Sequence, residues 1–174
     1  MTLPTFKYHP DPLGNGSIEE SDEICGCCGK ARGYIYCPVI YSRQSVPPVC
    51  PWFIADGSVA AKYDAEFVDS HPLYQGGASE EAIEEVSKRT PGYFSIQQEQ
   101  WLCHCNDACE YHGEASLADL KAVKDDELAK IFESTYLDEN EWQSLLANYS
   151  PGSGECLKFV CRHCGDIRIG LDLD

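Results

Sequence analysis

The residues best suited to chemistry are cysteines that form two closely spaced pairs in the second half of the chain. Three residues separate Cys105 from Cys109, and two separate Cys161 from Cys164, with Gly165 directly after the last pair. Paired thiolates are preferred ligands of zinc, which binds four soft or borderline donors in a tetrahedron. A glycine after the second cysteine permits the left-handed backbone of a tight knuckle turn. The spacing therefore predicts a zinc site made of these four cysteines.

Other side chains near these pairs compete as ligands: Cys103, His104, Cys156 and His163. Three intervening residues are less typical of a metal-binding pair than two, so the first pair is the weaker signal. We nevertheless prefer four cysteines, because a single histidine in such a place is more often a core or surface residue. If all four remain unliganded, they are buried reduced thiols.

A second group of cysteines lies in the first half of the chain: Cys25, Cys27, Cys28, Cys37 and Cys50. Cys25 and Cys28 have the knuckle spacing, but Phe53 stands two residues beyond Cys50, and phenylalanine cannot ligate a metal. We expect zinc on Cys25, Cys28 and Cys50 if Cys27 or Cys37 supplies the fourth thiolate. Otherwise the site keeps an open coordination position, or its thiols are redox-active. The sequence therefore predicts one zinc ion, and a second under that condition.

The cysteine count bears on the compartment. The chain has 11 cysteines, its first residues lack the apolar core of a signal peptide, and no apolar run approaches the roughly 18–20 residues of a membrane helix. We therefore expect a cytoplasmic protein without membrane insertion. In the reducing cytosol, a cysteine-rich chain uses its thiols for metal more often than for disulfides.

The charge is strongly negative, at −16 from 29 acidic and 13 basic residues. Sustained contact with nucleic-acid phosphates needs several Lys or Arg side chains on one face, and the sequence has no such cluster. We therefore expect no nucleic-acid partner. A protein partner remains open, as does the oligomeric state.

The elements that must position the second cysteine pair are two strands. Residues 157–160 and 167–171 alternate apolar and polar side chains, which predicts a β-hairpin with Cys161 to Gly165 in its turn. Residues 33–37 are aromatic and β-branched, and predict a strand near the first cysteine group.

Three helices are predicted between these elements, at residues 80–89, 117–134 and 139–148, with a short one at 59–63. Ser79, Ser116 and Asp138 are the expected N-caps of the longer three, and acidic residues suit the first turns. The fold class is thus α+β, with small antiparallel β-hairpins carrying the knuckle turns and three or four helices inserted between them. We expect an extended arm over 1–24, a subdomain over 25–92 and a zinc subdomain over 93–174, with one compact domain overall as the alternative.

The chain resembles the CbrC family, an uncharacterised bacterial family that includes a colicin E2 tolerance protein. The resemblance covers nearly the whole chain and rests on short motifs in a specific order: Phe6-Lys7-Tyr8-His9-Pro10-Asp11-Pro12, Cys25 with Cys28, Tyr34-Ile35-Tyr36, Cys50-Pro51-Trp52, Ile54-Ala55-Asp56-Gly57, Arg89-Thr90-Pro91-Gly92-Tyr93, Trp101 with His104-Cys105, Asp107 and Cys109, and Cys161 with Cys164-Gly165. The family pattern has cysteine at the position of Phe53. The resemblance implies a link to colicin tolerance for one relative and supplies no molecular activity.

Three functions compete. A non-enzymatic interaction module stabilised by structural zinc is preferred, because a zinc closed by thiolates has no position for substrate. The proline-rich arm and residues 51–53 are its expected contacts with a partner. The alternatives are a thiol or metal redox sensor at the irregular first group and a zinc-dependent hydrolase. For the hydrolase, His112 and Glu114 followed by Cys161 and Cys164 resemble a zinc deaminase pattern, although Val160 replaces the expected proline.

Overall fold

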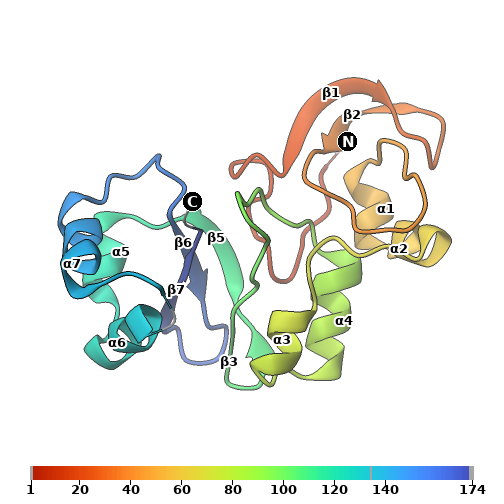
Figure 1. Cartoon of the computed structure of the whole chain (residues 1–174). Helices are drawn as coiled ribbons and strands as arrows, with labels where there is room; N and C mark the ends of the chain where they lie inside the picture. The colour runs from red at the N-terminus through yellow and green to blue at the C-terminus, as the bar shows by residue number, and fades with distance from the viewer. Residues whose placement is uncertain (1, 134, 173–174) are drawn as a thin grey trace.

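The N-terminal half combines one β-ribbon with four short helices (Figure 1). The structure is a computed structural model that describes residues 2–133 and 135–172. Strand β1 (Ile18–Ile24) pairs antiparallel with β2 (Ala31–Tyr36). Helices α1 (Pro51–Ala55), α2 (Ser58–Tyr63), α3 (His71–Gln75) and α4 (Glu80–Arg89) follow. Residues 18–24, expected to be part of an extended arm, are therefore a strand.

The C-terminal half contains two small sheets and three helices. Strands β3 (Cys103–His104) and β4 (Asp107–Ala108) form a minimal hairpin. Strands β5 (Glu110–Glu114), β6 (Cys156–Val160) and β7 (Ile167–Leu171) form an antiparallel sheet in that order. Helices α5 (Leu117–Ala122), α6 (Asp125–Glu133) and α7 (Glu139–Asn148) lie between β5 and β6 in the chain and gather at one end of the molecule in Figure 1.

The predicted α+β class is confirmed, with seven helices in the part of the chain that the structure describes. Ser79 caps α4 by accepting the Ala82 N–H, and Ser116 and Asp138 each form a complete capping box. The helix predicted over 117–134 is two helices, because the backbone at Val123 is extended. That break lets Val123 bury its side chain in the core beneath α5 and α6.

Three buried clusters hold these elements together. The central cluster joins α4, the segment around Tyr93 and Trp101, and strands β4 to β6. A second lies under the β1–β2 ribbon and α1–α2, and a third lies between α5–α7 and the sheet. On α7, Trp142 is buried in the third cluster, as is Tyr149 just after the helix, and Leu145 and Leu146 pack against it. None of the helices within residues 2–133 and 135–172 is long and apolar enough to span a membrane.

The start of the chain is packed into the central cluster rather than exposed. Tyr8 and His9 are fully buried, and the His9 ring meets Trp101 and Tyr111 edge-on. The His9 Nδ1 lies 2.9 Å from the Pro91 carbonyl, which can only accept, so Nδ1 carries the proton. The His9 Nε2 then accepts from Asn15 at 3.2 Å. The ring is therefore neutral, and burial lowers its pKa from 6.5 to about 4.

This pKa predicts an acid-sensitive contribution to stability. The unfolded chain binds a proton at His9 below about pH 6.5, whereas the folded chain does so only below about pH 4, so stability is lost as the pH falls between these values. His9→Asn is less stable than wild type at pH 7, and the gap should narrow by about 2 kcal/mol at pH 5. Urea denaturation at the two pH values measures this change.

Acid also protonates the thiols of both proteins equally, so the difference between them isolates His9. The exposed His71 offers the matched control, and His71→Asn should leave the pH dependence unchanged. An equal gap at pH 7 and pH 5 would show that His9 is not held neutral. Among the neighbouring charged groups, Asp11 raises the His9 pKa and His112 lowers it.

Candidate metal centre

A strained two-residue turn presents the first donors of the centre. Cys105 and Asn106 connect β3 to β4 and both have positive φ, at 54° and 61°. This pattern is that of a type I′ hairpin turn, which closes a hairpin in two residues. A non-glycine residue in this region costs of order 1–3 kcal/mol and persists where the surroundings require it. The turn lifts His104 and Cys105 out of the central cluster.

A knuckle turn between β6 and β7 presents the other donors. The Gly165 N–H donates to the Cys161 carbonyl at 2.9 Å, and Gly165 has φ of 77°. Burial raises the pKa of the Cys161 thiol, but the backbone N–H groups of Cys164 and His163 favour its thiolate more, and together they lower the pKa to about 6. The turn thus presents a buried sulfur atom at Cys161 and an exposed one at Cys164.

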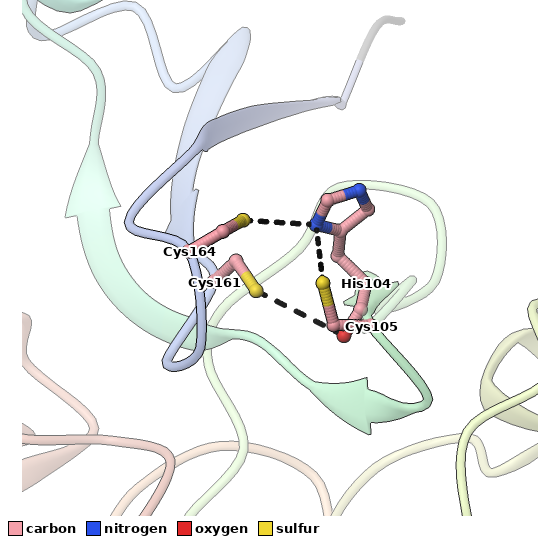
Figure 2. A group of neighbouring side chains, drawn as sticks. All are labelled: His104, Cys105, Cys161 and Cys164. Carbon is pink, nitrogen blue, oxygen red and sulfur yellow. Dashed lines mark hydrogen bonds between the residues drawn. The ribbon is translucent and has the colours of Figure 1, made fainter.

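The two turns face each other and bring together the donors of His104, Cys105, Cys161 and Cys164 (Figure 2). Their ligand atoms all lie within 4.8 Å of one another. The His104 Nδ1 is 3.3 Å from the Cys164 Sγ and 3.5 Å from the Cys105 Sγ. Ligands of a tetrahedral zinc, at about 2.3 Å for sulfur and 2.0–2.1 Å for nitrogen, lie roughly 3.5–3.8 Å apart. The group therefore has the composition and size to hold a metal ion.

Cys109, expected in this site, lies elsewhere. It is fully buried in the central cluster, where its carbonyl accepts from the Trp101 indole at 2.9 Å and its N–H donates to Leu102. The tight turn at Cys105 explains the difference, because the chain has already reversed and returned to the core by residue 109. His104, one of the alternatives, lies with the three cysteines instead.

The remaining competitors, Cys103, Cys156 and His163, are not members of this group either. Cys156 is buried in the third cluster, and Cys103 packs against the central cluster beside Gly76. The His163 Nε2 contacts a carboxylate oxygen of Asp107 at 2.9 Å.

That contact belongs to a polar network that holds the knuckle against the body. The Tyr8 hydroxyl donates to the other Asp107 oxygen at 2.5 Å. Arg162, also in the knuckle, pairs with Glu110 at 3.1 Å. Both residues between the knuckle cysteines therefore bind carboxylates of the β4–β5 segment, and the N-terminal arm joins them through Tyr8. Sequence spacing gave no sign of Tyr8, 99 positions from its partner.

The first cysteine group also assembles, but with three members. The Sγ atoms of Cys25, Cys28 and Cys50 lie within 4.8 Å of one another. Cys37, offered as a fourth ligand, is not among them, and its thiol donates to the Ile35 carbonyl at 3.7 Å. Cys27 is also outside the group, and burial raises the pKa of its thiol.

Within the described residues, His112 and Glu114 of the deaminase-like pattern do not join either group. His112 pairs with Glu110 at 3.2 Å on an exposed part of β5. The Glu114 carboxylate accepts the backbone N–H groups of Gly152 and Gly154. Glu114 therefore anchors the loop before β6.

Comparison with known proteins places the whole chain in one family. The family model described as "Uncharacterised protein family (UPF0167)" matches residues 3–173. The chain is 46% identical over 173 residues to the UPF0167 protein PA1536 of Pseudomonas aeruginosa, covering 98% of this chain and 97% of that one. It is 40% identical over 124 residues to the UPF0167 protein Mb2317 of Mycobacterium bovis, covering 71% and 66% of the two chains. No solved structure matches the chain.

The expected resemblance to an uncharacterised family is confirmed at that level. The names of the matched family and relatives carry neither the CbrC name nor a connection with colicins. On the match to residues 3–173 and the identity with the Pseudomonas relative, the chain belongs to the uncharacterised protein family UPF0167.

Proposed function

We propose that the protein is a zinc-stabilised, non-enzymatic interaction module in which His104, Cys105, Cys161 and Cys164 hold one structural zinc ion. The observation that carries the proposal is the convergence of four donor atoms from two turns far apart in the chain. Three thiolates and one imidazole are a common donor set for structural zinc. Four protein ligands complete the tetrahedron, so this site has no position for a substrate or a hydrolytic water.

The physical role of the ion follows from what the two turns connect. The β3–β4 turn extends from the Trp101 segment, and the knuckle joins β6 to β7. Zinc would lock these two segments together at the surface, where Cys105 and Cys164 are exposed and the central cluster ends. Binding free energy at such a site contributes directly to folding, because the unfolded chain has no preformed site.

The proposal places the protein in the cytoplasm, where cysteines are kept reduced. Thiolates must be available for zinc, because disulfides cannot ligate it.

Part of the surface expected to meet a partner is buried. Phe6, Tyr8 and His9 of the arm are buried, and so is Pro51 at the start of α1. Leu13 of the arm is 40% exposed, and Phe94 and Ile96 in the segment before Trp101 are each 59% exposed. These exposed apolar side chains are available to a partner.

The choice of His104 over Cys109 predicts opposite results for two alanine variants. His104→Ala removes a ligand, so it should weaken zinc binding by more than the roughly 10–100-fold typical of changes outside the ligand shell. Cys109→Ala changes a buried thiol in the core, so it should retain zinc and lose some stability instead. Competition with a chromophoric chelator measures zinc affinity, and urea denaturation measures stability. Loss of zinc from Cys109→Ala with full retention in His104→Ala would contradict the proposed ligand set.

Removal of zinc should loosen both turns. Treatment with a strong chelator is expected to accelerate hydrogen exchange at the Gly165 and Cys161 amides, whose bonds shape the knuckle. Amides of α4 serve as the internal control, because that helix has its own cap and buried face. Unchanged exchange in the knuckle after complete metal removal would show that zinc does not stabilise this region.

A further inference from the structure

The three sulfur atoms of Cys25, Cys28 and Cys50 form a second group that is built like the first. In its knuckle, the Gly29 N–H donates to the Cys25 carbonyl at 2.7 Å, and Gly29 has φ of 67°. The corresponding values at Gly165 are 2.9 Å and 77°. The Cys50 N–H donates to the Cys25 Sγ at 3.3 Å. The same backbone hydrogen bond, closed by a left-handed glycine, therefore shapes the knuckle turn in both cysteine groups.

The two groups differ in whether the chain supplies a fourth ligand. Cys50 begins α1, and the residue one helical turn later, where a second thiolate would face the same ion, is Phe53. Phe53 packs instead against the cluster beneath the β1–β2 ribbon. The Cys27 thiol interacts with Cys25 but is not mutually close to all three sulfurs. Among the described residues, three sulfur atoms therefore lie mutually within 4.8 Å here, and no fourth donor joins them at that distance.

A positive charge lies beside one sulfur atom of the group, that of Cys50. The Arg32 guanidinium is 3.9 Å from the Cys50 Sγ, and it stacks over the Trp52 ring at 4.5 Å from the centroid. Three thiolates around a divalent ion leave a net charge of about −1, and a nearby guanidinium offsets it. Cys25 and Cys50 are buried, whereas Cys28 is half-buried.

We propose that Cys25, Cys28 and Cys50 form a three-thiolate site for a thiophilic metal ion such as Zn²⁺, whose fourth coordination position is filled by an external ligand. Water or a small thiol has the required chemistry. This site uses different residues from the structural zinc site and stands independently of it. Its open position makes its metal the more exchangeable of the two.

Metal content separates the two sites. Native mass spectrometry of the reduced full-length chain after incubation with Zn²⁺ should give two ions for wild type, one for Cys28→Ser and two for the neighbouring control Cys27→Ser. One ion in both wild type and Cys28→Ser would overturn the three-thiolate site while leaving the structural zinc in place. One ion in wild type and none in Cys28→Ser would support the three-thiolate site and remove the structural one.

Protection of thiols from alkylation can be measured on the wild-type protein, so this test does not depend on whether a variant folds. Wild-type protein is alkylated with and without Zn²⁺, and the modified cysteines are identified by peptide mapping. Zn²⁺ should protect the half-buried Cys28 and leave the half-buried Cys37 equally reactive in both samples. Equal reactivity of Cys28 with and without Zn²⁺ would overturn the proposal.

The open coordination position at the Cys25, Cys28 and Cys50 site is tested by replacing Phe53 with cysteine. Phe53→Cys should slow the release of the more labile zinc ion to a chelator by roughly 10–100-fold relative to Phe53→Ser, which removes the same ring without adding a ligand. Zinc release from the Cys161 site provides the internal reference in both variants. Equal release from the two variants would overturn the open coordination position.

Discussion

The burial of Trp101 is the interaction on which the arrangement of the cysteines depends. Its side chain is fully buried among Tyr93, Tyr111 and Phe159, and its indole N–H donates to the Cys109 carbonyl. These contacts join the segment before β3 to strands β5 and β6. Because β3 begins two residues after Trp101, the same packing sets where the β3–β4 turn meets the β6–β7 knuckle. The central core therefore determines which donors converge at the surface.

The two cysteine groups show how similar local structures can give different coordination. Each has a knuckle closed by a left-handed glycine, at Gly29 and Gly165. At the C-terminal group, the opposing turn contributes two donors, from His104 and Cys105. At the N-terminal group, the opposing helix contributes one, from Cys50. A site with four protein donors suits a structural ion, whereas three donors leave a position for exchange.

The charged side chains beside the two cysteine groups also differ. The Asp107 carboxylate joins Tyr8 of the arm to His163 of the knuckle, so the arm, the hairpin and the knuckle form one hydrogen-bonded unit. Because Asp107 is itself largely buried, these bonds are less screened than exposed ion pairs. At the N-terminal group, the Arg32 guanidinium lies beside the Cys50 sulfur. A cation in that place balances thiolate charge without adding a ligand.

The amino-acid sequence by itself determined several of the local elements, since their signals lie within a few residues of one another. Ser79, Ser116 and Asp138 were correct N-caps, and the strands around Cys161 and Cys164 formed the expected hairpin. The sequence also indicated which cysteines form knuckles. Only the tertiary structure decided that His104 rather than Cys109 meets that knuckle, and that Cys27 and Cys37 lie outside the other group. The reason is physical: a two-residue turn and the burial of Trp101 choose which side chains face outward, and neither effect can be obtained from the spacing of cysteines.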